Sequence, residues 1–81
     1  MTSEAIYAEL SKIFRDVLDD DSLILRPDLT ANDVADWDSL SHVRIVLTVQ
    51  KRFGVTFPAA QTAGLKNVGE LVSLIQSRVT A

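Results

Sequence analysis

The sequence contains no cysteine, which excludes disulfide bonds and thiolate metal sites and makes a reducing, cytoplasmic setting the default expectation. It has no apolar run near the roughly 18 residues that a membrane-spanning helix needs. The first ten residues, MTSEAIYAEL, lack the basic segment and the following apolar stretch of a secretion signal. With 81 residues, the chain is expected to form one domain, residues 1–81, with a single small core and little room for an enclosed active site.

Basic residues are scarce, and the two signs of charge are separated along the chain. Eight aspartates and one arginine lie between residues 16 and 38, whereas five bases and one glutamate lie between residues 39 and 81. The resulting dipolar surface can steer partners of either sign. Five bases without an exposed aromatic series are too few for a nucleic-acid-binding stripe. Nucleic acid is therefore not an expected partner.

Apolar residues at helical spacing predict two long helices in the first two thirds of the chain, over about 4–18 and about 39–53. Ser3 is expected to cap the first helix. Asp38 is expected to cap the second, and Gly54 to end it. The second helix is apolar over more than half of its circumference, so part of that surface is expected to face a partner.

Two further helices are predicted after residue 54. A short one follows Pro58 over 59–63 and stops at Gly64, and the last one starts at Asn67, with Glu70 as a partner in a capping-box-like pair. The expected fold is all-α, a small four-helix bundle of three main helices and one short helix. Its core is expected to contain Ile13, Val49, Phe53 and Ile75.

Residues 19–38 form an unusually long connection between the first two helices. They show no sustained period, and Pro27 disfavours a helix through the preceding residue. A connection of about twenty residues is uncommon in a compact domain and is usually functional or disordered. Its apolar residues argue against disorder and predict a loop pinned across the core, with a short turn of helix: Leu23, Ile24, Leu25, Leu29 and Val34.

Ser39 stands in the stretch DWDSLSHV at the start of the second predicted helix, and three roles compete for its hydroxyl. In the simplest, serine only helps to cap the helix, as is common beside aspartate. In the second, Ser39 is a hydrolase nucleophile with His42 as its base. No G-x-S-x-G elbow or preceding strand supports that role, and an exposed or partner-facing His42 is expected instead. In the third, Ser39 is an attachment point for a phosphate at a helix N-terminus.

The order of the predicted helices and the run DSLSHVRIVLTVQKRFGV resemble the acyl carrier protein family, which includes peptidyl carrier domains. The resemblance covers nearly the whole chain and implies a protein that is not an enzyme. Such a protein carries acyl or aminoacyl groups as thioesters on a 4′-phosphopantetheine arm. The resemblance implies that the arm is attached to Ser39, flanked by Asp38. The implied docking residues on the second helix are Leu40, Val43, Arg44, Leu47 and Lys51.

The partners that the resemblance implies are a phosphopantetheinyl transferase, a ligase that loads acyl or aminoacyl groups, and downstream acyl-processing enzymes. A monomer is expected. Two features differ from the usual fatty-acid-synthesis carriers. The helix over 39–53 contains no acid and shows Arg44, Lys51 and Arg52, where those carriers are strongly acidic. Trp37 stands where they often have a small residue.

These differences indicate a specialised pathway rather than the housekeeping one. Trp37 is expected to anchor the loop through apolar burial, the alternative being a place in the docking surface. The alternative function for the chain as a whole is that of a small helical interaction module. It would never be modified, and it would use the helix over 39–53 only for docking.

Overall fold

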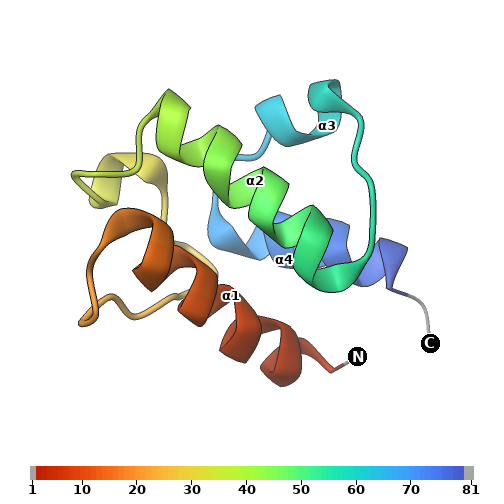
Figure 1. Ribbon diagram of the computed structural model, residues 1–81, viewed down its shortest axis with the longest axis horizontal. Coiled ribbons are helices and arrows are strands. Elements are labelled where there is room, and N and C mark those ends of the chain that lie inside the picture. Colours follow the sequence, from red (N-terminus) through yellow and green to blue (C-terminus); the bar gives the residue numbers. More distant parts are fainter. Residues whose placement is uncertain (1, 80–81) are drawn as a thin grey trace.

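The computed structural model describes residues 2–79, apart from the side chain of Ala59. It contains four α-helices and one short 3-10 helix, arranged as Figure 1 shows: α1 (Ser3–Leu18), η1 (Ala31–Asp33), α2 (Ser39–Phe53), α3 (Ala59–Ala63) and α4 (Val68–Arg78). The predicted all-α bundle is confirmed. The first three α-helices start and end within one residue of their expected bounds, and α4 starts one residue after the expected Asn67. Within the described chain, no helix is long and apolar enough to cross a membrane.

The ends of α1 and α2 follow from local chemistry. Thr2, not Ser3, caps α1, because the Thr2 hydroxyl accepts a hydrogen bond from the N–H of Ala5 at 3.2 Å. The prediction for Ser3 was wrong by one position, since Ser3 is already the first helical residue. Asp19 directly follows α1 as its C-cap residue and has a left-handed φ of 52°. The predicted end of α2 at Gly54 is confirmed, with a left-handed φ of 66° that glycine adopts without strain.

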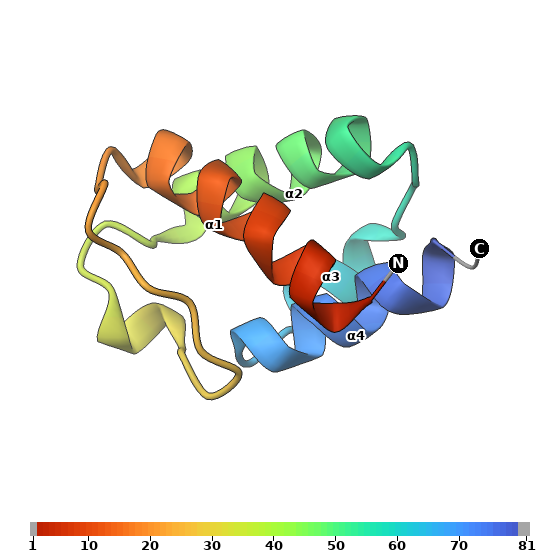
Figure 2. The same ribbon diagram turned by 90° about the horizontal axis from the view of Figure 1, so that it is seen from below.

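One apolar core lies between the helices, with α1 packed against both α2 and α4 (Figures 1 and 2). Its buried apolar residues are Ile6, Leu10, Ile13, Phe14, Leu18, Leu29, Trp37, Ile45, Val46, Val49, Phe57, Val68, Leu71, Val72 and Ile75. Three predicted core residues, Ile13, Val49 and Ile75, are confirmed. Phe53 is only partly buried, because it is the last residue of α2 and packs at the edge of the core. Phe57, which is 6% exposed, is the buried phenylalanine of this region.

The loop over residues 19–38 is held against the helices rather than extended into solvent. Leu29 is buried in the core, and three further residues pack against it, as predicted: Leu23, Leu25 and Val34. Ile24 does not, because it is 72% exposed, and the prediction for this residue was wrong. The guanidinium Nε of Arg15 on α1 donates a hydrogen bond to the carbonyl of Leu23 at 2.9 Å. The start of the loop is therefore fixed to α1.

The same loop also supplies hydrogen-bond acceptors to the first turn of α4. The N–H groups of Val68 and Gly69 donate to the carbonyls of Leu29 and Pro27, each at 2.9 Å. These are amide groups that a helix start cannot satisfy internally. A Cβ atom on Gly69 would lie 3.0 Å from the Pro27 carbonyl oxygen, so the absence of a side chain permits this close approach.

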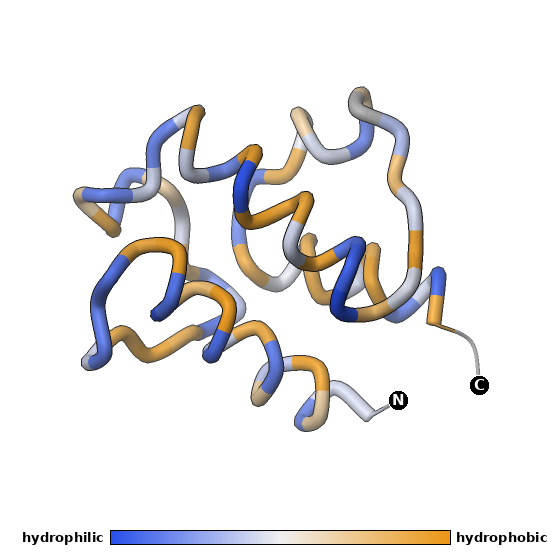
Figure 3. Tube along the Cα trace, viewed as in Figure 1, coloured by the Kyte–Doolittle hydropathy of each residue, from blue (hydrophilic) through white to orange (hydrophobic). Residues whose placement is uncertain are grey.

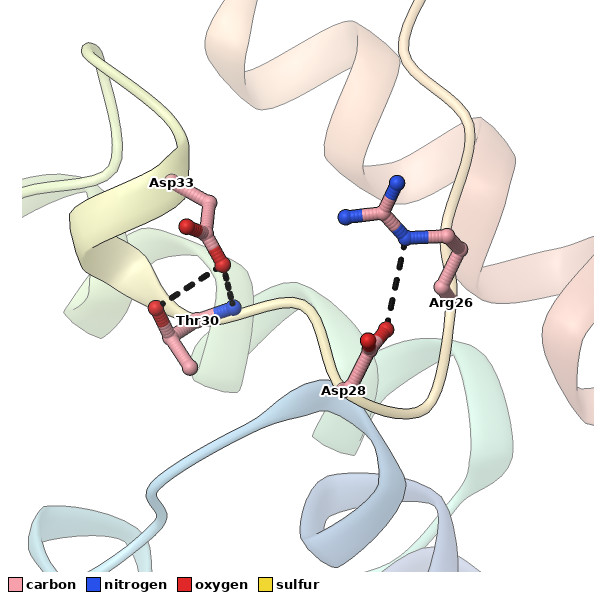
Figure 4. Close-up of polar contacts among 4 residues, drawn as sticks. All are labelled: Arg26, Asp28, Thr30 and Asp33. Carbon is pink, nitrogen blue, oxygen red and sulfur yellow. Dashed lines mark hydrogen bonds and ion pairs between the residues drawn. The ribbon is translucent and has the colours of Figure 1, made fainter.

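The short helix η1 is the turn of helix predicted within the loop. Figure 4 shows the Asp33 carboxylate accepting hydrogen bonds from the N–H of Thr30 at 3.0 Å and from the Thr30 hydroxyl at 3.1 Å. The backbone bond and then the hydroxyl bond lower the pKa of Asp33. Arg26 and Asp28 form an exposed ion pair at 3.3 Å nearby. Local polar contacts therefore shape the loop between its apolar anchors.

The start of α2 and the two ends of the bundle lie apart. In Figures 1 and 2, the loop leads into α2 on the left side of the molecule, whereas the start of α1 and the end of α4 lie on the right. The longest dimension of the molecule, 33 Å, runs horizontally in both views. Ser39, as the first residue of α2, is thus far from both ends of the bundle.

Candidate functional site

Ser39 is presented at the first position of α2, directly after the loop. Asp38 caps this helix, because its Oδ1 atom accepts a hydrogen bond from the N–H of Ser41 at 2.9 Å. That backbone bond is the main cause of a lowered Asp38 pKa, so the carboxylate is ionised near neutral pH. The Ser39 side chain is exposed, and within residues 2–79 its hydroxyl makes no hydrogen bond. Asp38 therefore caps α2, and the Ser39 hydroxyl is accessible to a modifying enzyme.

His42 is not placed to act as a base for Ser39. The indole Nε1–H of Trp37 donates to Nδ1 of His42 at 3.2 Å, and Nε2 of His42 lies 3.0 Å from the carbonyl oxygen of Thr62. A carbonyl oxygen only accepts hydrogen bonds, so these contacts assign the ring proton to Nε2. Both ring nitrogens are thus engaged away from Ser39. The hydrolase hypothesis therefore lacks its base. His42 is half-buried between the loop and α3 rather than exposed, and a partner-facing His42 stays a prediction.

Trp37 anchors the end of the loop, as predicted. Its side chain is only 8% exposed, and its ring meets Phe14 of α1 edge-to-face with ring centroids 5.0 Å apart. On its other side the indole lies nearly parallel to the His42 ring, at a centroid distance of 6.2 Å. Because Trp37 directly precedes Asp38, this packing fixes the chain just before Ser39. The Trp37–His42 contact was not predicted from the sequence, because the five-residue spacing joins a loop residue to a helix residue.

Two hollows lie beside α2, one at its start and one along its middle. The first, of about 290 Å³, is lined by Ser39 together with residues of the loop, of α2 and of the chain around the end of α3: Ala31, Trp37, Asp38, His42, Ala63 and Leu65. The second, of about 220 Å³, is mainly apolar and lies between α2 and the chain from Phe57 to α3, with His42, Val43, Val46, Leu47 and Phe57 in its lining. For scale, a cavity of about 150 Å³ accommodates benzene. A group attached to Ser39 therefore has room beside its attachment point.

The outer face of α2 is partly apolar, as its sequence predicted. Leu40, Val43 and Leu47 are 73%, 53% and 55% exposed, which is unusual for side chains of this type when they cluster on one helix. Arg44 and Lys51 are exposed on the same helix. Figure 3 shows the hydrophobic and hydrophilic segments alternating along α2. We call the five residues Leu40, Val43, Arg44, Leu47 and Lys51 the outer face of α2.

Arg52 does not belong to this outer face, although it is one of the three bases of α2. Its guanidinium lies 3.4 Å from the carboxylate of Glu9 on α1. Each residue turns a helix by about 100°, so Lys51 returns close to the direction of Arg44 whereas Arg52 points toward α1. The basic charge on the outer face is therefore that of Arg44 and Lys51.

The sequence and the fold of this chain match one family of known proteins. The family model described as a phosphopantetheine attachment site matches residues 8–75. An acyl carrier protein of Rhodococcus erythropolis is 37% identical over 75 residues, which cover 93% of this chain and 82% of that protein. A meromycolate extension acyl carrier protein of Mycolicibacterium smegmatis is 36% identical over 75 residues, covering 93% and 76%. The solution structure of a holo acyl carrier protein from Geobacter metallireducens matches with a TM-score of 0.84 and 37% identity, covering 90% of this chain and 84% of that chain.

These matches define a carrier protein whose prosthetic group is 4′-phosphopantetheine, not an enzyme. More narrowly, the chain belongs to the acyl carrier protein family, whose members work with the enzymes of acyl biosynthesis. When bound, the group supplies a thiol for thioester formation. The described residues fit such a group, because the start of α2 offers an exposed, unbonded hydroxyl beside a hollow.

Proposed function

We propose that Ser39 is the residue that carries the 4′-phosphopantetheine arm, transferred from coenzyme A by a phosphopantetheinyl transferase. The supporting observation is the Ser39 hydroxyl itself, which is exposed, makes no hydrogen bond and stands at the N-terminus of α2. A phosphate bonded there meets the positive end of the helix dipole. Because both ring nitrogens of His42 are engaged elsewhere, the transferase is the proposed source of the base that removes its proton. Asp38 flanks the site and, by capping α2, holds Ser39 at the first helical position.

The test compares Ser39→Ala with Ser41→Ala, which removes the next hydroxyl along the chain. Each variant is incubated with coenzyme A and a broad-specificity transferase, and its intact mass is measured. We expect the added mass on the wild type and on Ser41→Ala, but not on Ser39→Ala, while the helical circular dichroism of all three stays similar. Added mass on Ser39→Ala would show that the arm is attached elsewhere. A chain that is never modified would leave the unmodified interaction module as the better description.

We further propose that the loaded protein works as a monomer in a specialised pathway, in a cytoplasmic setting. It is loaded by an acyl- or aminoacyl-activating ligase and serves downstream acyl-processing enzymes. Two observations support this. The helix α2 contains no acid, and relatives of similar identity include proteins named for meromycolate extension. Such a carrier needs partner enzymes other than those that bind the strongly acidic helix of the usual fatty-acid-synthesis carriers.

The outer face of α2 is the proposed docking surface for these partners. Its exposed apolar residues, Leu40, Val43 and Leu47, can be buried against an apolar patch. Arg44 and Lys51 add positive charge to the same face, so a partner with acidic or neutral groups around its patch is favoured. Basic docking patches are disfavoured by the same charges. Exposed charge pairs contribute only about 0–1 kcal/mol each, so the preference should be seen mainly in association rates and their salt dependence.

A further inference from the structure

A further hollow lies beside the last part of α2. It has a volume of about 420 Å³ and is lined by residues of α2 and of the chain that follows it: Leu47, Thr48, Gln50, Lys51, Val55 and Thr56. Leu47 and Lys51 also belong to the outer face of α2. Since a helix rises about 1.5 Å per residue, this hollow begins about 12 Å along the helix axis from Ser39. It therefore extends the outer face of α2 away from the proposed attachment point.

The wall of this hollow is held in place by Gln50. The backbone carbonyl of Gln50 accepts hydrogen bonds from the N–H groups of Gly54 and Val55, the latter at 3.1 Å. Its side-chain Oε1 atom accepts another from the N–H of Phe57 at 2.8 Å. Phe57 is buried, so the segment over residues 54–57 is fixed at both ends. The hollow is consequently preformed, and a partner that enters it does not have to order the wall first.

The polar part of the hollow offers N–H donors and a positive charge. A backbone N–H can only donate, so the bond from Phe57 identifies Oε1 of Gln50 as the acceptor and leaves the NH₂ group at the other end of the amide. This NH₂ group makes no hydrogen bond within the described residues. Among the described residues of the lining, Lys51 is the one with a charge, and it is exposed. Such a combination suits a carboxylate.

The apolar part of the hollow is formed by Leu47 and Val55. Leu47 is 55% exposed although it is a large apolar side chain, and Val55 is partly buried against the core. A group that covers both residues removes apolar surface from water. The hollow has room for such a group, since a cavity of about 150 Å³ accommodates benzene. An occupant that matches both parts has an apolar group with a carboxylate close to it.

We propose that this hollow is a docking pocket for a partner enzyme, which inserts an apolar side chain beside Leu47 and presents a carboxylate to Gln50 and Lys51. The inference deepens the proposed function and rests on it, because it gives the outer face of α2 a partner of defined chemistry. The affinity comes from the apolar side chain, and the carboxylate selects the partner, because exposed charge pairs contribute little energy and mainly provide specificity.

Two other occupants fit the hollow less well. A second copy of this chain that docked symmetrically through the same face would bring Arg44 and Lys51 of both copies together, and like charges oppose such contact. A group attached to Ser39 has a nearer hollow, whose lining includes Ser39 itself. A partner enzyme is therefore the occupant that the charges and the position of this hollow favour.

The first experiment measures the binding of 3-phenylpropionate, an aromatic ring with a nearby carboxylate, to the unmodified protein. NMR follows the backbone amides and the side-chain NH₂ group of Gln50 up to low millimolar probe concentrations, the affinity range of so small a molecule. We expect resonances of Leu47, Gln50 and Val55 to shift. The neutral 3-phenylpropanamide should bind about fivefold more weakly at low salt. The difference should shrink at high salt, because the ion pair is exposed.

The matched variant is Gln50→Glu, because a glutamate carboxylate can still accept the bond from Phe57 but offers no donor and adds a negative charge. It should keep its helical circular dichroism and weaken 3-phenylpropionate binding about fivefold, without weakening that of 3-phenylpropanamide. Lys51→Gln, at an exposed position, provides the same comparison if Gln50→Glu does not fold. Thr56→Phe adds a ring at the rim of the hollow and should weaken both probes, whereas Ala8→Phe adds it on the exposed side of α1 and should weaken neither.

Two further measurements separate a partner enzyme from an acylated arm. The transferase is given hexanoyl-coenzyme A, so that an acylated arm is attached to the protein, and the titration is repeated. An arm that fills the hollow would exclude the probe, whereas we expect unchanged binding. Loading of the holo protein by the proposed ligase is then measured for wild type and Gln50→Glu. We expect KM to rise about fivefold with little change in kcat, because docking rather than chemistry is affected.

The inference is overturned if 3-phenylpropionate shifts no resonance of the hollow, or if Gln50→Glu and Lys51→Gln bind it as the wild type does. It is also overturned if the acylated arm excludes the probe, or if the KM for loading is unchanged in Gln50→Glu. Sedimentation that shows a dimer which Thr56→Phe dissociates would assign the hollow to a second copy instead. The probe titration uses the unmodified protein, so it and the mass test of Ser39 can fail independently.

Discussion

Replacing Phe14 by leucine should destabilise the protein through the contact that anchors Trp37. Phe14 is fully buried, and its ring meets the indole edge-to-face at a centroid distance of 5.0 Å. Leucine keeps an apolar side chain at this position, and such swaps usually cost less than about 1.5 kcal/mol. The lost aromatic pair adds about 0.5–1.5 kcal/mol. We therefore expect the free energy of unfolding to fall by about 2 kcal/mol.

This loss is large enough to measure and small enough to leave a folded protein. In a domain of this size, 1 kcal/mol shifts the melting temperature by about 4–8 °C, so the expected fall is about 8–16 °C. The total free energy of unfolding of a small domain is about 5–15 kcal/mol. Thermal unfolding followed by circular dichroism gives the shift. The fluorescence of Trp37, recorded below the transition, reports whether its surroundings have loosened.

The matched control is Phe53→Leu, the same chemical change at a ring that only borders the core. Within the described residues, Phe53 has no aromatic ring contact. Its replacement should lower the melting temperature by about 4 °C or less, because little buried contact is lost. Equal shifts for the two variants would refute the anchoring role of Phe14. An unchanged melting temperature for Phe14→Leu would refute it more strongly.

Three further predictions follow from the site and the loop. Arg44→Glu should slow loading by the proposed acyl- or aminoacyl-activating ligase, by up to about fivefold in kcat/KM at low salt. Lys12→Glu, the same charge change on α1, should not slow it, and equal effects would assign both to net charge. Gly69→Ala should lower the melting temperature by about 4–8 °C, because the added Cβ atom would lie 3.0 Å from the carbonyl oxygen of Pro27. Gly64→Ala is the control and should be tolerated, because its Cβ atom would have its nearest neighbour at 3.7 Å. A Gly69→Ala variant more stable than the wild type would contradict the close approach. Because hydrogen bonding lowers the pKa of Asp38, its stabilising effect is complete above the ordinary value of 3.8 and is lost as the pH falls through the folded-state value. Asp38→Asn should flatten that part of an acid titration of stability, and an unchanged acid limb would count against the cap.

The helices were predictable because each carries local signals that agree with its apolar period. The helix α2 is the clearest case, since Asp38 can cap, Gly54 can adopt a left-handed conformation, and the residues between them are apolar at helical spacing. The exposed Ser39 could be located for the same reason. That Ser39 is exposed although Trp37, two residues earlier, is buried is shown by the structure and not by the sequence.

Tertiary contacts account for the predictions that failed. Phe53 and Phe57 are both plausible core residues in the sequence, and only the turn after α2 decides that Phe57 points inward. That turn is held by a bond from the N–H of Phe57 to the side chain of Gln50 at 2.8 Å. Ile24 is exposed because it lies between two loop residues that pack inward, Leu23 and Leu25. No local pattern encodes which loop residues face the core.

The contacts of His42 and Arg52 could not be predicted from the neighbouring sequence either. Both residues lie on α2, and their partners belong to other segments: Trp37 and Thr62 for His42, and Glu9 for Arg52. A helical wheel gives the direction of a side chain, but it does not show which neighbouring segment that direction meets. The packing of α3 and α1 around α2 supplies this information.

The separation of Ser39 from the two ends of the bundle has a practical consequence for attachment. A linker joined before α1 or after α4 would leave the molecule on the side opposite the start of α2 (Figures 1 and 2). A neighbouring domain, an affinity tag or a sensor surface could therefore be connected at either end without covering the serine. A tethered copy could then turn about its linker and present the arm proposed for Ser39 to several enzymes in succession.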